Sequence, residues 1–510
     1  MSSLFIRKSL ADCEHDIAER GGLKRSLNKW HLTALGVGAT IGAGIFATTG
    51  TAIVGDAARP GAGPAIILSF MLTAVACGFA ALCYAEFAAM VPIAGSAYTY
   101  AYASLGEFVA WIIGWDLIIE YAVGNIGVAI GWSGHFRELL AHFSISLPPW
   151  LATDYRSAHD AVRALAAGAT DPTTAYVASA MATAPRVFGL PVIANLPAFL
   201  VVMAITVILV RGIRESANTN NAMVLLKVGL IIFFISVGIF LIKPSHWTDV
   251  ATGGFAPNGF AGISAGAAII FFSYIGFDAV STAAEEAKDP AKDMPFGIIM
   301  SLAICTVLYI ALSAVMTGMA PWKVLGTAEP MITALTYSEG PAALLSFSRL
   351  VIALGAVIAM GSVLLVFQLG QPRIFFSMAR DGLLPPFIAR VHPRYRTPYV
   401  GTIITGVFVG VFAAFANIAE VVDLTNIGTL FAFVLVSLGV IVLRIKEPDR
   451  VRPFRAPWVP VTPLISVTAC LYLMLQLPKI TWERFAIWLV AGLVIYFLYS
   501  QHHSRLRNPS

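Results

Sequence analysis

The stretch GVGATIGAGIF at residues 36–46 decides the fold, because it places four glycines inside an apolar run long enough to cross a membrane. Each glycine in a helix interior costs about 1 kcal/mol relative to alanine. Backbone groups left unpaired in lipid are costlier still, so a break at this depth is tolerated only where protein or a water-filled cavity surrounds it. The stretch therefore predicts an interrupted membrane helix that forms part of a binding site.

The composition is that of a membrane protein. The 510 residues are 58% hydrophobic and only 12% charged, whereas soluble domains carry roughly 25% charged residues. The charged N-terminal segment, 1–29, contains no apolar core of a signal peptide and is expected in the cytosol. We therefore predict an all-α integral membrane protein with many spans.

The sequence lacks the motifs of several common enzyme and metal-binding classes. It contains no glycine loop ending in GKS or GKT, no HExxH and no cysteine cluster, so neither phosphate nor metal chemistry has residues to carry it. The five cysteines show no paired spacing. We expect a non-enzymatic protein with no cofactor, no metal and no nucleic-acid partner.

Apolar stretches of about 20 residues, each sufficient for a ~30 Å hydrocarbon core, recur along the chain. The loops after the even-numbered stretches are basic, notably 211–215, 372–398 and 444–455. Such loops stay in the cytosol, so both termini are expected there. The twelve stretches are 30–54, 64–91, 98–133, 191–210, 221–243, 258–284, 295–320, 342–371, 398–417, 421–443, 457–477 and 482–500.

Two connecting segments are long. Segment 141–190 is expected outside the cell, where it would form short surface helices without a role in substrate binding. Segment 372–398 is basic and amphipathic, which is compatible with a short helix on anionic lipid headgroups. Both are interpreted as connectors rather than domains.

The sixth stretch matches the first. IIFFSYIGFDAVSTAAEE, residues 269–286, is interrupted at mid-span by Ser273, Gly276 and Asp278. Close helix packing would explain either glycine motif alone, but a matched pair running in opposite directions predicts a five-plus-five inverted repeat with two added helices. The predicted units are the cytosolic segment 1–29, the repeats 30–243 and 258–443, the added helices 457–500 and the cytosolic tail 501–510.

The two breaks together predict a site for a small zwitterion. The second half of a broken helix presents free N–H groups and the first half presents free carbonyls, and the helix dipole adds charges of matching sign. We expect the N–H groups to bind an α-carboxylate, the carbonyls to accept from an α-ammonium, and Phe272 to close over the ligand. The substrate-binding candidates are Thr40, Ile41, Gly42, Ala43, Gly44, Ile45, Phe272, Ser273, Ile275 and Gly276.

Several motifs together closely resemble the cationic amino acid transporter family of the amino acid, polyamine and organocation superfamily. They include GVGATIGAGIF, GWDLIIEYAVG, FFSYIGFDAVSTAAEEAKDPAKDMP and GQPRIFFSMARDGLLPPFIARVHPRYRTPYVGTIITG. The likeness runs from about residue 20 to residue 500, and the span count is similar to that of bacterial members. The resemblance implies the leucine-transporter fold, alternating access in the plasma (inner) membrane, and proton-driven amino acid uptake.

Two intramembrane carboxylates are candidate partners for the substrate or for coupling. Glu120 lies four residues after Asp116 on one helix face, and Asp278 lies two residues after Gly276. Such carboxylates mark ion or substrate paths by default. A structural hydrogen bond is the alternative for Glu120, and bracing of the unwound strand or an inner gate is the alternative for Asp278.

Lys227 is the candidate for proton coupling. It lies in the fifth stretch, about six residues and roughly 9 Å past Asn221 at the cytosolic boundary. A lysine at this depth could extend to the lipid headgroups, whereas burial in the bundle would penalise its charged form. The resemblance supports the buried position, because proton-coupled bacterial members carry a lysine here. Its ammonium would then bind the broken first helix near Gly38 to Ile41.

The expected function is proton-coupled symport of an amino acid, with the amino acid, protons and the lipid bilayer as partners. An exchanger without net proton movement and a non-transporting amino acid sensor are the alternatives. The eighth stretch has an apolar wall around Val357–Gly361 that includes the bulky Met360. This wall favours small neutral substrates, while the preferred amino acid stays open.

Overall fold

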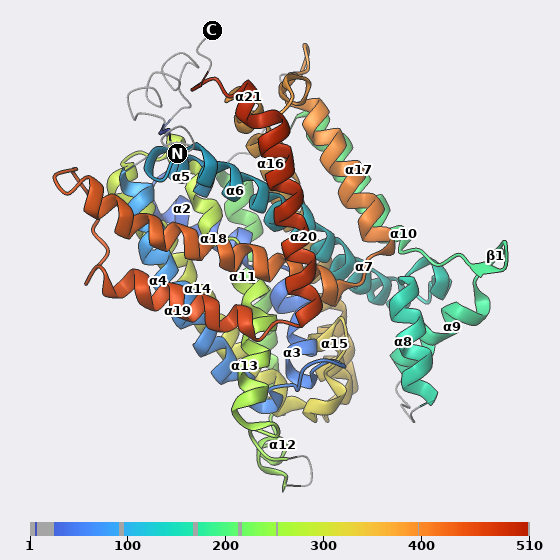
Figure 1. The fold of residues 1–510 in the computed structure, drawn as a ribbon. Coiled ribbons are helices and arrows are strands. Elements are labelled where there is room, and N and C mark those ends of the chain that lie inside the picture. The colour runs from blue at the N-terminus through green and yellow to red at the C-terminus, as the bar shows by residue number, and fades with distance from the viewer. Residues whose placement is uncertain are drawn as a thin grey trace.

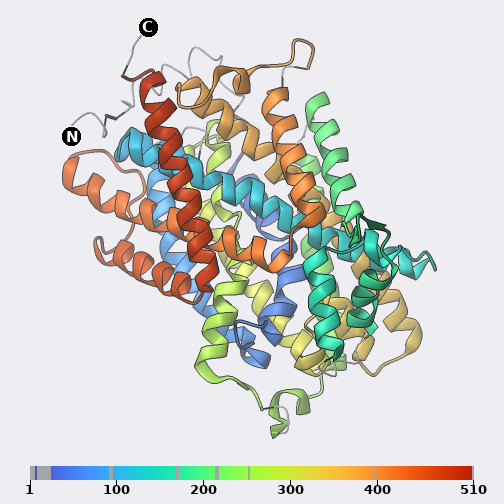
Figure 2. The same ribbon diagram turned by 45° about the vertical axis from the view of Figure 1, so that its right-hand side comes forward.

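The computed structural model describes residues 6–7, 25–90, 96–166, 172–212, 217–250, 253–395 and 397–507. These residues form a bundle of helices with one short two-stranded hairpin, as Figures 1 and 2 show. Most of the predicted segment 1–29, part of the basic loop 211–215 and the end of the tail 501–510 lie outside the described residues.

Nine helical stretches in the described residues are long and apolar enough to cross a membrane. They are Lys29–Val54, Gly63–Met90, Glu107–His142, Asn221–Leu241, Gly259–Ala284, Pro290–Met319, Ala342–Arg380, Ile418–Lys446 and Lys479–His503. Shorter apolar helices, α10 (Leu196–Arg211), α17 (Tyr399–Phe415) and α19 (Val461–Leu475), occur at three further predicted stretches.

The interrupted helices lie at the centre of the bundle. Within the apolar part of each span, 89% of the residues of the first and sixth helices and 83% of those of the third are buried. The corresponding value for the last helix is 22%. The first comprises α2 (Lys29–Thr40) and α3 (Thr49–Val54), the third α6 (Glu107–Ile118) and α7 (Gly124–His142), and the sixth α13 (Gly259–Ile270) with its continuation. The surrounding helices are α4 (Ile66–Met90), α11 (Ala217–Gly238), α14 (Pro290–Met319), α16 (Ala342–Arg380), α18 (Ile418–Lys446) and α20 (Lys479–Ile495).

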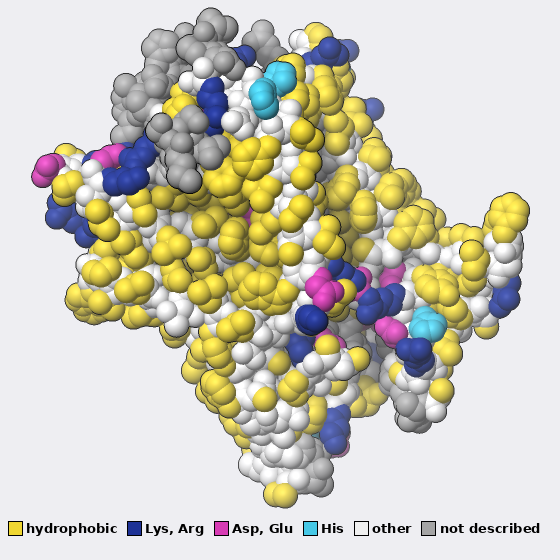
Figure 3. Space-filling model, in the orientation of Figure 1, with side chains coloured by type: hydrophobic (Ala, Val, Ile, Leu, Met, Phe, Trp, Pro, Cys, Tyr) yellow, Lys and Arg dark blue, Asp and Glu magenta, His cyan; other side chains and the backbone are white. Residues whose placement is uncertain are grey.

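The outer surface of the bundle is apolar. Figure 3 shows a broad face of hydrophobic side chains over α18, α19 and α20. Leu471, Ile487 and Val490 on this face are exposed. A surface of this extent would be unfavourable in water, so these helices are suited to contact with lipid.

The third predicted stretch, 98–133, is not a single helix. Residues Ser96–Ser104 form a separate helix, α5, and α6 begins at Glu107. Gly106 separates them with a φ of 103°, a left-handed conformation that glycine adopts without a Cβ clash. The sequence prediction was wrong here because the aromatic residues of α5 extend the apolar pattern up to the turn.

The segment 372–398 also differs from its prediction. Its first part continues α16 as far as Arg380, and a single 3-10 turn, Pro386–Ala389, follows. The expected separate amphipathic helix on the headgroups is therefore replaced in the described residues by an extension of α16.

The segment 141–190 forms short helices, as predicted. α8 (Tyr155–Ala166) and α9 (Pro172–Thr183) precede the hairpin strands β1 (Arg186–Val187) and β2 (Leu190–Pro191). The two helices share a small apolar cluster that includes Ala158 and Ala180. Asn417 Nδ2, at the start of α18, donates to Ser157 Oγ at 3.0 Å, which fixes α8 to the bundle.

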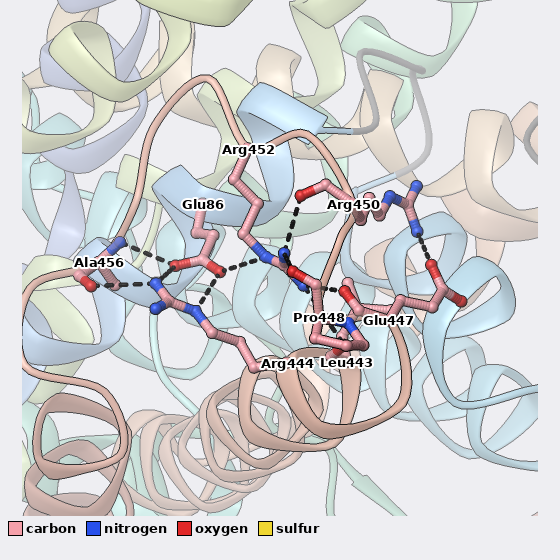
Figure 4. Close-up of polar contacts among 8 residues, drawn as sticks. All are labelled: Glu86, Leu443, Arg444, Glu447, Pro448, Arg450, Arg452 and Ala456. Atoms are coloured by element: carbon pink, nitrogen blue, oxygen red, sulfur yellow. Dashed lines mark hydrogen bonds and ion pairs between the residues drawn. The ribbon is translucent and has the colours of Figure 1, made fainter.

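A buried carboxylate clamps the end of α4 to the end of α18 and to the chain that follows it. Glu86, which is 0% exposed, receives Arg444 Nε at 3.0 Å and Arg444 Nη2 at 2.7 Å. Arg452 Nε lies 3.4 Å from the same carboxylate, and the N–H of Ala456 donates to it at 2.8 Å (Figure 4). Two arginines and a backbone donor therefore compensate a single buried charge.

A second buried carboxylate, Glu107 at the start of α6, joins the two ends of the chain. Its N–H donates to Ile6 O at 2.9 Å, and its side chain receives Arg507 Nε at 2.8 Å. The hydroxyls of Tyr102 and Tyr496 donate to it at 3.2 and 3.0 Å. Segments near the two termini thus lie on the same side of the bundle.

Candidate functional site

The first helix is broken within the predicted glycine stretch. α2 ends at Thr40, and Ile41 has an extended conformation. Helical hydrogen bonding resumes with Phe46 N, which donates to Gly42 O at 3.2 Å. The N–H groups of residues 42–45 precede this bond at the start of a helix, where no intrahelical acceptor is available to them.

The sixth helix is broken at the same relative position. α13 ends at Ile270, and a 3-10 turn, Phe271–Tyr274, follows. Ile275 is extended, and Gly276 has a φ of 121°, which an L side chain rarely adopts. The chain then continues as the 3-10 helix Phe277–Glu286. The carbonyls around the break leave helical geometry, as the sequence predicts.

The glycines let the two broken segments touch through their backbones. A Cβ built on Gly44 would lie 2.3 Å from Ser273 Cα, and one built on Gly276 would lie 2.8 Å from the carbonyl carbon of Ala39. Neither distance can hold a side chain without movement of the backbone. The structure thus brings the predicted N–H groups and the predicted carbonyls to one place in the core.

Two side chains cap the free carbonyl end of α2. Lys227 Nζ donates to Gly38 O at 2.5 Å, and Tyr309 OH donates to Thr40 O at 3.1 Å. Lys227 is 1% exposed, so its side chain points into the bundle rather than toward lipid headgroups. An ammonium group suits this position, because the carbonyl end of a helix carries partial negative charge.

Asn426 of α18 has the corresponding role at the sixth helix. Its Nδ2 donates to Ala268 O at 2.7 Å and lies 3.3 Å from Ile269 O, at the end of α13. Neither Asn426 nor Tyr309 was among the sequence candidates. An amide inside an apolar helix is a signal that could have identified Asn426, whereas nothing in the sequence distinguishes Tyr309 from a packing aromatic.

Phe272 lies against the third helix. Its Cζ is 3.4 Å from a Cβ built on Gly127, and its Cε2 is 3.9 Å from one built on Gly124. The neighbouring aromatics face elsewhere: Phe271 packs edge-on against a phenylalanine of α18, and Tyr274 donates to a backbone carbonyl of α4. Phe272 is therefore the aromatic at this break that can cover a ligand between the first and third helices.

Apolar side chains of α16 line the other side of the glycine stretch. Val363 Cγ2 is 3.0 Å from a Cβ built on Gly42, whereas Met360 Sδ is 3.6 Å from one built on Gly131 of α7, a position that also lies 3.4 Å from Ala43 Cβ. Both α16 side chains are buried. A substrate side chain bound here would meet an uncharged wall, as the eighth stretch predicts.

Glu120 and Asp278 are buried near one another, and Glu120 Oε2 and Asp278 Oδ2 have no hydrogen-bond partner among the described residues. Glu120 lies in a π-helical turn, Ile119–Val123, a deformation that is frequent at functional sites. Asp278 Oδ1 accepts from the N–H of Gly276 at 3.3 Å. In the part of the chain that the structure describes, neither carboxyl forms an ion pair with a lysine or arginine. This proximity places the third helix beside the break in the sixth.

The family model described as amino acid permease matches residues 27–498. The chain belongs to this family. The match covers nearly all of the apolar helices and both breaks, so the resemblance inferred from the sequence is confirmed.

Curated relatives resemble this permease over almost its whole length. The branched-chain amino acid permease BcaP of Bacillus subtilis (strain 168) is 44% identical over 505 residues, covering 99% of each chain. The methylthioribose transporter of the same organism is also 44% identical, covering 99% of this chain and all of the relative. The vacuolar cationic amino acid transporter 4 of Arabidopsis thaliana is 37% identical, covering 88% of this chain and 68% of the relative.

Family membership and the apolar helices together identify the permease as a multi-pass membrane transporter. The relatives are transporters, which agrees with the expectation of a non-enzymatic protein. An amino acid is the substrate class that the family and the branched-chain relative support.

Proposed function

We propose that the permease is a secondary active transporter that couples amino acid uptake to protons by alternating access. In this proposal twelve spans form a leucine-transporter-like five-plus-five inverted repeat with two added helices. The protein lies in the plasma membrane with both termini in the cytosol, and 141–190 is extracellular. The opposed breaks of the first and sixth helices support this arrangement.

The proposed substrate site is the meeting point of the two breaks. The N–H groups of residues 42–45 bind the α-carboxylate, and carbonyls near Phe272, Ser273 and Ile275 accept from the α-ammonium. The apolar wall of α16 favours a neutral aliphatic side chain, in agreement with the substrate named for the branched-chain relative. An amine without a carboxylate would leave the N–H groups unpaired in a dry site.

A thiosugar is the second candidate substrate, because the methylthioribose transporter is as similar to this chain as the branched-chain permease. Such a substrate carries no charges for the two helix ends. Competition against labelled leucine distinguishes the candidates: an amino acid substrate predicts competition by valine and isoleucine but not by methylthioribose or leucinamide.

Lys227 is the proposed coupling residue. Its ammonium stabilises the end of α2 by donating to Gly38 O. When Lys227 loses its proton, the positive charge is removed from the carbonyl end of the helix. The first helix then becomes free to move. Burial favours the neutral form whenever the hydrogen bond is broken, so proton release and movement of the first helix favour one another.

The Glu120 and Asp278 pair is proposed as a second group that holds a proton. Two buried carboxyls that lie near one another without a cation are unfavourable when both are ionised, so in this proposal the pair holds at least one proton. The pair lies beside the backbone of Gly276, and a change in its proton would therefore act on the sixth-helix break.

The observation that carries the proposal is the buried Lys227 bound to the broken first helix. Uptake of labelled leucine into proteoliposomes, with and without an acidic exterior, tests the proposal. A symporter accumulates substrate only with the gradient. An exchanger responds to internal unlabelled leucine instead, and a sensor binds leucine without uptake.

A further inference from the structure

The hairpin that precedes α10 carries an exposed apolar tip. The exposed fractions are 54% for Val187, 102% for Phe188 and 69% for Leu190. Phe188 and Gly189 have φ values of 50° and 81°, a two-residue turn in which Asn-Gly is the preferred sequence. A phenylalanine here adopts a rare conformation for a bulky residue, and its fully exposed ring is unfavourable in water.

The hairpin is held close to the ends of α10 and α17. Beyond it, Ala194 N donates to Trp150 O at 2.9 Å and Asn195 N donates to Ala414 O of α17 at 2.8 Å. Figure 1 shows β1 extending sideways near the ends of α10 and α17, while α8 and α9 continue away from them. The tip is therefore directed sideways, away from the bundle, and not along α8 and α9.

The exposed apolar surface continues from the hairpin into the lipid-facing side chains of α10. Val192 is 40% exposed, Leu196 is 39% exposed and Leu200 is 54% exposed. Arg186, at the base of the tip, is also exposed. Aromatic and aliphatic side chains beside a basic residue suit the interfacial layer of a membrane, where the rings enter the acyl boundary and the cation meets phosphate.

We propose that this hairpin anchors the 141–190 segment to the bilayer. Phe188, with Val187 and Leu190, inserts into the interfacial layer of the leaflet opposite the chain termini, and Arg186 binds lipid phosphate there. The segment is then held at a fixed height above the membrane instead of being a freely solvated loop. The lateral direction of the hairpin and its continuity with α10 select lipid over a protein partner.

Spin labels placed by cysteine substitution test this proposal in vesicles of phosphatidylcholine and phosphatidylglycerol. A Cys13→Ser background leaves four cysteines, all buried. Labels are placed at Phe188→Cys, at Asp160→Cys on exposed α8 as the aqueous reference, and at Leu200→Cys on α10 as the lipid reference. Accessibility to oxygen and to a nickel chelate is then measured by power saturation.

The tip label is expected to match the lipid reference, with high accessibility to oxygen and low accessibility to nickel. A match to the aqueous reference would overturn the proposal. Low accessibility to both reagents would indicate a protein contact, such as a second copy, and would overturn it as well.

A second variant distinguishes the contribution of the Phe188 ring from that of the backbone turn. Phe188→Asn keeps a residue that tolerates the left-handed conformation but removes the apolar ring. A label at Val187→Cys is expected to lose its preference for oxygen in this variant. An unchanged preference would show that the ring does not hold the hairpin in the membrane.

Discussion

Glu86 and Glu120 are both buried glutamates, yet their surroundings are opposite. Glu86 receives two arginines and a backbone N–H, whereas Glu120 lies near another carboxyl, Asp278, and meets no lysine or arginine in the described chain. The ion pairs of Glu86 hold their helices in place, because separating them would leave a buried charge without a partner. An uncompensated carboxyl can stay neutral and exchange its proton without breaking an ion pair.

The same contrast extends to the cations. Arg507 is bound to Glu107 at the helix ends, while Lys227 in the interior donates to a backbone carbonyl. The interior of the permease thus contains a lysine, Lys227, and three carboxyls, those of Asp116, Glu120 and Asp278, that form no ion pair within the described residues. The paired carboxylates fix the ends of helices, whereas the unpaired interior groups can change charge as the helices move.

The largest expected effect is the loss of accumulation in Lys227→Ala. One pH unit is worth about 1.4 kcal/mol, so coupling to one proton supports about tenfold accumulation per unit. Without the ammonium this accumulation is expected to fall to the level without a gradient. Lys227→Arg, which cannot release its proton, is expected to bind leucine but not accumulate it. Uptake by proteoliposomes at imposed pH gradients measures both results.

Lys243→Ala is the matched control for the lysine. Lys243 follows the same helical stretch but pairs with the exposed Glu339. We expect accumulation to be unchanged in this variant. Wild-type accumulation in Lys227→Ala would remove the lysine from the coupling mechanism and leave it a structural cap.

The next effect is on stability, at the clamp around Glu86. Glu86→Gln leaves two arginines without their counter-charge and should destabilise the protein by about 3 kcal/mol, as for other broken buried pairs. Glu447→Gln removes the charge from a side chain that is 37% exposed and pairs with Arg7 and Arg450, and it should cost less than about 1 kcal/mol. Denaturant titration in detergent measures the free energy of unfolding of both variants. Equal stabilities would show that burial does not strengthen the clamp.

Local sequence features predicted the breaks better than the clamps. The glycines of residues 36–46 and Gly276 mark places where backbones must approach closely, and the lysine was placed from its depth in an apolar stretch. The glycine inference needs only the spacing of residues along one helix, whereas the resemblance to proton-coupled bacterial members supported the buried position of the lysine and its contact with the first helix. The structure places Lys227 Nζ on Gly38, within the range expected from the sequence.

Contacts between residues far apart in the chain were not predictable in the same way. Glu86 and Arg444 are 358 positions apart, and Glu107 and Arg507 are 400 apart. Each is an ordinary charged residue near the end of an apolar stretch, and only the packing of the helices determines which charges meet. The separation of α5 was missed for a local reason, although Gly106 offered the signal of a helix end.

A smaller destabilisation is expected at the second clamp. Arg507→Met removes the cation from Glu107, but the hydroxyls of Tyr102, Tyr496 and Ser504 still donate to the carboxylate. The loss should therefore be about 1–2 kcal/mol, less than at Glu86. Arg505→Met, at an exposed neighbour, is the control and should be neutral. A loss as large as that in Glu86→Gln would mean that the hydroxyls do not share the charge.

The smallest effect on stability is expected where the interior carboxyls meet. Glu120→Gln keeps a neutral hydrogen-bonding group beside Asp278, so the free energy of unfolding should change by less than about 1 kcal/mol. Transport should change more, because the amide cannot take up or release the proposed proton, and the dependence of leucine uptake on external pH should become flatter. Asp160→Asn, on the exposed helix α8, provides the control and should leave both stability and the pH dependence of uptake unchanged. Destabilisation comparable to that of Glu86→Gln would show that the interior pair is an ionised structural contact, and the distinction between the two sets of carboxylates would fail.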